Sequence, residues 1–192
     1  MHHPPWDQRG PFVIASVLDE DLVARLLAAL KAGQAKPRSY QGVVDLTERD
    51  CSYVEVPQAL AEEVNGAIGA HVAACYGVET APMENQPQLI YSYGEGVGFV
   101  AHHDEVTDIE RERAADTGQP VIGGDVTCVL FLTGPDQYAG GELFFEDPAM
   151  EVRPAAGALV TFPATRTFMH GVNRISAGER ITLLARRTTA TA

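Results

Sequence analysis

The stretch Val126-Thr127-Cys128-Val129-Leu130-Phe131-Leu132-Thr133 is an unbroken run of apolar and β-branched residues, typical of a buried strand. Comparable short runs rich in Val, Ile, Phe, Tyr and Thr follow one another after residue 87, separated by turns that contain Gly or Pro. The predicted strands are Gln88–Tyr93, Gly98–Asp104, Val126–Thr133, Glu142–Phe145, Ala158–Phe162, Thr167–His170 and Arg180–Arg187. So many short strands in one chain indicate a sandwich or a barrel.

The part before this β region has a helical pattern. Phe12–Leu18 reads as a short strand, and Asp19 stands in the position of an N-cap before a helix that ends at Gly33. A second helix is predicted from Pro57 to Gly77. The chain is therefore expected to be α+β, mostly β with two N-terminal helices.

The composition is that of an ordinary globular protein, with 192 residues, 45% hydrophobic and 21% charged. This length fits one domain with a sizeable core. We expect a single domain over residues 1–192, with a strand and helices in 1–87 and the β core in 88–187.

Charge and cysteine content exclude several classes of function. There are 14 basic and 26 acidic residues, a net charge of −12, so binding to nucleic acid or to an anionic membrane is not expected. The three cysteines are widely spaced and form no CxxC pair, which argues against a disulfide framework or a zinc knuckle. The start of the chain lacks the features of a signal peptide and no apolar run is long enough for a membrane span, so a cytoplasmic protein is expected.

The tract Ala101-His102-His103-Asp104 carries the clearest chemical signal. In a strand, residues two apart project to the same face, so His102 and Asp104 can meet one metal ion while His103 points away. The motif alone is weak evidence, but it ends a longer pattern, Tyr-x-x-Gly-x-x-aromatic-x-x-His-x-Asp, that begins at Tyr93. The tract therefore predicts a metal site.

His170 offers a third ligand, in the sequence Phe168-Met169-His170-Gly171-Val172. Two histidines and one carboxylate with open positions opposite are the ligand set of non-haem Fe(II) oxygenases. Further along, Arg180 supplies a planar cation suited to the distal carboxylate of a co-substrate. Thr182 lies on the same strand face and can add a hydroxyl donor.

With these residues the chain resembles the prolyl 4-hydroxylase-like 2-oxoglutarate/Fe(II)-dependent oxygenases, from about Leu89 to Arg186. The resemblance implies a double-stranded β-helix, or jelly roll, with two buttressing helices and Fe(II) at its open end. It also implies that Tyr93 contacts 2-oxoglutarate. Where some relatives place a tyrosine against this co-substrate, the chain has Phe131, so Tyr93 or Thr182 is expected to carry more of the binding.

The resemblance implies a dioxygenase that uses Fe(II), 2-oxoglutarate and dioxygen to hydroxylate an unactivated C–H bond. A small-molecule substrate is expected, such as a free or carrier-bound amino acid or a natural-product intermediate. A prolyl or other peptidyl residue of a protein is the alternative within this chemistry. A non-catalytic metal- or ligand-binding jelly roll, and a cupin-like isomerase or hydrolase, are alternatives that do not need Arg180 and Thr182.

The polar segment Glu105–Gly124 interrupts the β region directly after the first two candidate ligands. A long polar loop in a compact domain is commonly functional, so a lid over the site is one interpretation. A short surface helix over Val106–Ala115 is the other. No feature of the sequence indicates an oligomeric state.

Overall fold

A computed structural model describes residues 5–37, 51–84, 86–107, 111–112, 115–116 and 123–189. In these residues the fold has two larger antiparallel sheets, a separate strand pair, two α-helices and a short 3-10 helix, η1 (Trp6–Gln8). The larger sheet has the order β1 (Phe12–Ile14), β11 (Leu159–Pro163), β7 (Val126–Phe131), β14 (Arg180–Thr189), β5 (Leu89–Tyr93), β3 (Cys51–Glu55) and β2 (Lys36–Pro37), and β4 (Thr80–Pro82) also pairs with β14. The smaller sheet has the order β10 (Met150–Val152), β9 (Leu143–Phe145), β12 (His170–Val172) and β6 (Phe99–His102). A further pair is formed by β8 (Tyr138–Gly140) and β13 (Ile175–Gly178).

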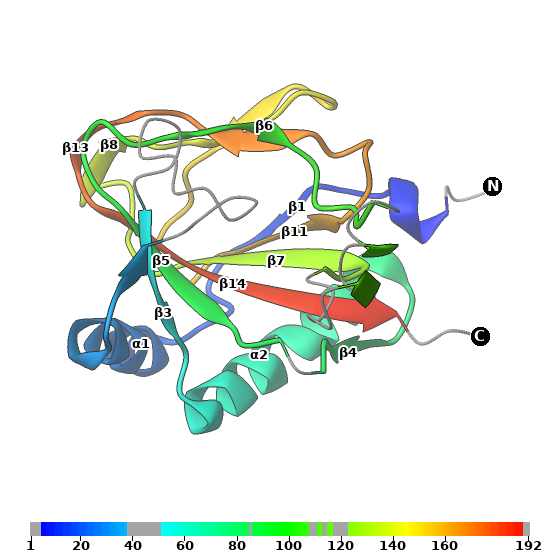
Figure 1. Cartoon of the computed structure of the whole chain (residues 1–192), viewed down its shortest axis with the longest axis horizontal. Helices are drawn as coiled ribbons and strands as arrows, with labels where there is room; N and C mark the ends of the chain where they lie inside the picture. Colours follow the sequence, from blue (N-terminus) through cyan, green and yellow to red (C-terminus); the bar gives the residue numbers. More distant parts are fainter. Residues whose placement is uncertain are drawn as a thin grey trace.

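The two sheets lie over one another (Figure 1) and share an aromatic core. Phe131 and Phe162 of the larger sheet pack in one cluster with Phe99 and Phe145 of the smaller sheet. Alternation along each strand aims these side chains inward, and neither sheet closes into a barrel. The gap between the sheets is therefore filled by side chains.

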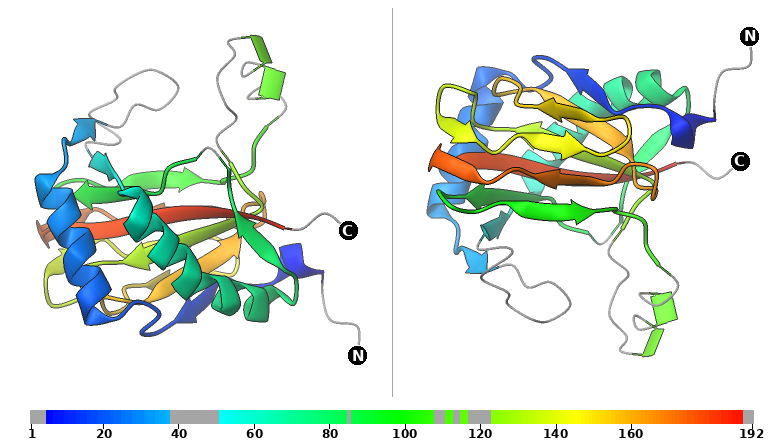
Figure 2. Two further views of the ribbon diagram at one scale, coloured as in Figure 1. Left: turned by 90° about the horizontal axis from the view of Figure 1, so that it is seen from below. Right: turned by 90° about the horizontal axis from the view of Figure 1, so that it is seen from above.

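The helices α1 (Glu20–Ala32) and α2 (Gln58–Tyr76) cover the outer face of the larger sheet (Figures 1 and 2). The Asp19 side chain accepts a hydrogen bond from the Leu22 amide and caps α1, as predicted. Gly77 ends α2 with a φ of 71°, a left-handed conformation that glycine adopts without strain. Apolar residues from both helices and from the back of the sheet form the largest core cluster. The predicted mostly β fold, with a jelly-roll core buttressed by two helices, is confirmed.

Some predicted strand limits are wrong. The strand predicted to continue to Asp104 ends at His102, and the one predicted over Thr167–His170 begins at His170. In the second case the Phe168 amide donates to the Thr165 carbonyl and closes a turn just before the strand. Strand β3 was not predicted, because its five residues mix polar and apolar types and only pairing with β5 fixes their conformation.

Most of the segment Glu105–Gly124 lies outside the described residues. Residues 111–112 and 115–116 are helical, and the Arg111 amide donates to the Thr107 carbonyl. The role of this segment as a lid stays a prediction. No helix in the described part of the chain combines the length and the apolarity that crossing a membrane requires.

Candidate metal and co-substrate site

The structure brings His102, Asp104 and His170 together. His102 ends β6 and His170 begins β12, and the two are direct partners across these antiparallel strands. Asp104 follows two residues after β6, and one ligand atom from each of the three side chains lies within 4.8 Å of the others. Its carboxylate oxygens lie 3.9 Å from Nε2 of His102 and 3.8 Å from Nε2 of His170. The three residues thus form a candidate metal centre.

Backbone contacts orient both imidazole rings. Nδ1 of His102 lies 3.0 Å from the Val100 carbonyl, and Nδ1 of His170 lies 2.9 Å from the Phe168 carbonyl. Because a carbonyl oxygen only accepts, each Nδ1 carries the proton and donates, which leaves the ring lone pair on Nε2. Metal-binding histidines are held in this way in proteins. Both rings therefore present a ligand atom towards Asp104.

Two residues of the larger sheet hold Asp104. Arg186 donates from Nη2 to Oδ1 at 2.8 Å, and the Thr127 hydroxyl donates to Oδ2 at 2.7 Å. Arg186 and Thr127 are themselves partners across β14 and β7. Burial raises the pKa of Asp104, but the positive charge of Arg186 and the nearby histidines outweigh it and hold the pKa well below its usual range. The carboxylate is thus kept ionised, the form that binds a metal ion.

Strand alternation is therefore only part of the reason that Asp104 reaches the site. Asp104 lies beyond the end of β6, so its position depends on Arg186 and Thr127, neither of which was predicted for the site. A signal for Arg186 was present: it lies an even number of residues after Arg180 and Thr182, and so on the same face of β14. His103 is not part of the cluster of ligand atoms.

Arg180 is buried, with 2% of its surface exposed, although it is charged. Its guanidinium carbon lies 5.5 Å from the centre of the Tyr93 ring and 4.9 Å from that of Phe131, and Nη1 donates to the Thr182 hydroxyl at 3.3 Å. Within the described ranges no carboxylate forms an ion pair with Arg180, and its Nε has no hydrogen-bond partner. Burial lowers the pKa of Arg180. A buried cation without a counter-ion is unfavourable, so this position is suited to an anionic ligand.

Residues 89–186 match the model of a known family, described as the 2OG-Fe(II) oxygenase superfamily. The chain belongs to this superfamily. It is 39% identical to a PKHD-type hydroxylase of Gluconobacter oxydans over 101 residues, which are 52% of this chain and 41% of that protein. It is 30% identical to a PKHD-type hydroxylase of Xanthomonas axonopodis over 173 residues, 88% of this chain and 74% of that protein.

Solved structures show the same fold. A viral collagen prolyl hydroxylase from Paramecium bursaria Chlorella virus-1 superposes with a TM-score of 0.68 at 14% identity, covering 94% of this chain and 96% of that one. A Pseudomonas putida prolyl-4-hydroxylase gives a TM-score of 0.63 at 20% identity, covering 93% and 92%. Several curated relatives are longer: the chain spans 41%, 44% and 53% of three of them, about half their length.

Membership of the 2OG-Fe(II) oxygenase superfamily implies Fe(II), 2-oxoglutarate and dioxygen as cofactor and co-substrates. The described residues fit these groups. Two imidazoles and one carboxylate are the donor set of non-haem Fe(II). The buried Arg180, which has no carboxylate partner among the described residues, fits the distal carboxylate of 2-oxoglutarate.

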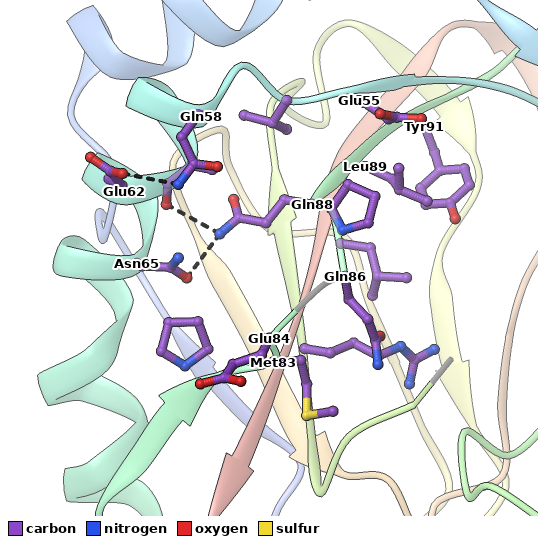
Figure 3. Close-up of a pocket in the computed structure, with 16 residues that line it drawn as sticks. Glu55, Gln58, Glu62, Asn65, Met83, Glu84, Gln86, Gln88, Leu89 and Tyr91 are labelled. Carbon is purple, nitrogen blue, oxygen red and sulfur yellow. Dashed lines mark hydrogen bonds between the residues drawn. The ribbon is translucent and has the colours of Figure 1, made fainter. Parts of the chain in front are cut away.

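A pocket of about 660 Å³ lies beside α2 (Figure 3), and none of the three candidate metal ligands lines it. Arg186, which binds Asp104, lies in its wall. The lining includes three carboxylates, from Glu55, Glu62 and Glu84, and four side-chain amides, from Gln58, Asn65, Gln86 and Gln88. The Gln88 amide nitrogen donates to the Ala61 carbonyl and to Asn65, whereas its buried oxygen has no partner in the described part of the chain. This pocket is called the α2 pocket below.

We expect Arg186→Met to weaken Fe(II) binding by about 10- to 100-fold, the range typical of residues that support a metal ligand. Without Arg186 the pKa of Asp104 rises, so the loss of affinity should deepen as the pH falls. Fe(II) affinity measured anaerobically at several pH values checks this.

Arg187→Met is the matched control. Arg187 is also buried on β14, but it points to the opposite face and donates to Thr80. It should lower stability without changing Fe(II) affinity. Equal Fe(II) affinity in Arg186→Met and in the unmodified protein would remove Arg186 from the support of the metal site.

Proposed function

We propose that this protein is a 2-oxoglutarate- and Fe(II)-dependent dioxygenase that hydroxylates an unactivated C–H bond. The observation that carries the proposal is the buried Arg180, which has no carboxylate partner among the described residues. It lies on β14, the strand whose Arg186 holds Asp104 of the His-Asp-His cluster. A metal-binding jelly roll without this chemistry needs the cluster but gains nothing from burying a cation. A cupin-like isomerase or hydrolase likewise has no use for Arg180 and Thr182.

In this proposal each residue has a defined task. His102, Asp104 and His170 hold Fe(II), and Arg180, Thr182 and Tyr93 hold the distal end of 2-oxoglutarate. When bound, the iron and 2-oxoglutarate supply the oxidising power that dioxygen needs to attack a C–H bond. The protein supplies geometry and a dry surrounding.

Aromatic rings provide the dry surrounding on the side of the smaller sheet. The centre of the Phe99 ring lies 4.0 Å from that of His102, and the centre of the Phe162 ring lies 4.5 Å from that of His170. Phe145 adds a third ring near His170. These rings exclude water from one side of the metal centre, which strengthens the electrostatic interactions within it.

A small molecule, such as a free or carrier-bound amino acid or a natural-product intermediate, is the proposed substrate. The α2 pocket supports this, because its volume of about 660 Å³ is in the range of small-molecule sites and Arg186 links it to Asp104. Glu55 is paired with Lys36, and the carboxylates of Glu62 and Glu84 favour a substrate with an amino group or another positive charge.

Hydroxylation of a prolyl or other residue in a protein is the second candidate. The carboxylates of Glu55, Glu62 and Glu84 at the α2 pocket are exposed to solvent, so a longer chain can also lie across it. The matched relatives are named hydroxylases, which agrees with either substrate class.

A paired assay tests the proposed function and separates the two substrate classes. The protein is supplied with Fe(II), 2-oxoglutarate and dioxygen, together with libraries of amino acids, amines and peptides, and products are analysed by mass spectrometry. We expect one substrate class to gain a single oxygen atom, with succinate formed in equal amount. Oxygenated peptides without oxygenated small molecules would contradict the small-molecule proposal and support the second candidate.

A further inference from the structure

Tyr138 lies beside Arg180, and the proton of its buried hydroxyl has no acceptor among the described residues. Arg180 interacts with this hydroxyl but can only donate to it. Its side chain is 4% exposed at the start of β8, where it pairs with Gly178 of β13. Buried hydroxyl groups in proteins almost always have a partner. A hydroxyl in this state is therefore a candidate for binding a ligand.

The ring of Tyr138 lies close to Arg180, with the bare backbone of Gly141 between them. A Cβ built on Gly141 would lie 3.1 Å from Cε2 of Tyr138 and 3.3 Å from Cδ of Arg180. Gly141 also has a φ of 67°, so a side chain is disfavoured there on two grounds. The absence of a side chain at this position allows the phenol and the guanidinium to face the same space.

The described surroundings place no acceptor within hydrogen-bond distance of the Tyr138 hydroxyl proton. Arg180 can only donate, and its Nε has no partner among the described residues. Phe131, which packs on the guanidinium, has no hydroxyl, and Thr182 already accepts from Nη1. A carboxylate is the group that accepts from both Arg180 and a phenol.

We propose that the Tyr138 hydroxyl donates a hydrogen bond to the distal carboxylate of the 2-oxo acid co-substrate, beside Arg180. This inference rests on the proposed function. It assigns to Tyr138 the hydroxyl contact that Phe131 does not offer, from a different strand. Tyr138 thus favours a co-substrate that has a second carboxylate. In this proposal it shares the binding of that carboxylate with Tyr93 and Thr182.

Two further observations support Tyr138 as a fixed donor. The guanidinium of Arg153 lies 5.7 Å from the centre of the Tyr138 ring, and Arg153 also donates to the Tyr138 carbonyl, so both ring and backbone are held in place. Burial raises the pKa of Tyr138, whereas Arg180 and Arg153 act in the opposite direction without reversing it. The phenol therefore keeps its proton and can donate a hydrogen bond to a carboxylate.

The test compares two ligands that differ in the distal carboxylate. Dissociation constants of 2-oxoglutarate and of 2-oxobutyrate, which lacks that carboxylate, are measured anaerobically by calorimetry on the Fe(II)-loaded full chain. We expect Tyr138→Phe to weaken 2-oxoglutarate binding by about tenfold or more, as for loss of a hydrogen bond to a charged group. Binding of 2-oxobutyrate should stay unchanged, because this ligand lacks the carboxylate to which the Tyr138 hydroxyl is proposed to donate.

Tyr76→Phe is the matched control, since the Tyr76 hydroxyl is buried and hydrogen-bonded to Thr161 in the helix-facing core. It should lower the melting temperature and leave both dissociation constants unchanged. Unchanged 2-oxoglutarate binding in Tyr138→Phe, or equal weakening of both ligands, would overturn the role of Tyr138. If Arg180→Ala still weakens 2-oxoglutarate binding in that case, the proposed function stands; no 2-oxoglutarate binding by the unmodified protein would overturn both.

Discussion

Alanine in place of His102, Asp104 or His170 should abolish Fe(II)-dependent turnover without unfolding the domain. The three side chains supply one ligand atom each, so each substitution removes one of the three protein ligands of the metal ion. Loss of a ligand should weaken Fe(II) binding by more than the roughly 10- to 100-fold expected for a supporting residue such as Arg186. Anaerobic Fe(II) titration, with circular dichroism to confirm folding, measures the effect.

Two matched variants sharpen this test. Asp104→Ala leaves Arg186 buried without its partner, so Asp104→Asn, which keeps the volume of the side chain, separates loss of the ligand from loss of stability. His103→Ala should keep Fe(II) affinity, since His103 is not part of the ligand cluster. Loss of iron in His103→Ala with retention in His102→Ala would show that the ligand assignment is wrong.

Arg180→Ala should raise the dissociation constant of 2-oxoglutarate by on the order of 100-fold or more. Removing one partner of a buried charged pair costs about 3–5 kcal/mol, and Arg180 is the buried cation of the proposed pair. Arg180→Lys should recover part of the affinity, because the charge remains while the planar fork that binds both carboxylate oxygens is lost.

Calorimetry on the Fe(II)-loaded chain measures these dissociation constants. Arg187→Lys is the control, because Arg187 is also a buried arginine of β14 but lies on the opposite face of the strand. It should leave the affinity unchanged. Full 2-oxoglutarate affinity in Arg180→Ala would exclude Arg180 from the co-substrate site.

Features set by local sequence were predicted well. The Asp19 cap and the apolar spacing defined α1, and the runs around Leu89–Tyr93, Val126–Thr133 and Arg180–Arg187 correspond to β5, β7 and β14. Each of these signals lies within a few residues, where strand or helix periodicity acts. His170, Arg180 and Thr182, which were predicted for the site, lie on β12 and β14.

Features that depend on distant pairing were not predicted. Arg186 and Thr127 meet only because β14 pairs with β7, and together they hold Asp104 outside the strand that carries His102. Tyr138 reaches Arg180 through the pairing of β8 with β13 and the bare backbone at Gly141. No local pattern encodes such contacts, because they arise from register between strands that are far apart in the chain.

Formation of succinate from 2-oxoglutarate tests the central claim most directly, because it needs no knowledge of the substrate. The assay uses the full chain with Fe(II) and dioxygen, and compares the unmodified protein with His170→Ala and Arg180→Ala under saturating Fe(II). We predict slow succinate formation by the unmodified protein, none by His170→Ala, and recovery in Arg180→Ala only at much higher 2-oxoglutarate concentrations. Equal succinate formation by His170→Ala, or none by the Fe(II)-loaded unmodified protein even with the substrate libraries present, would contradict the claim.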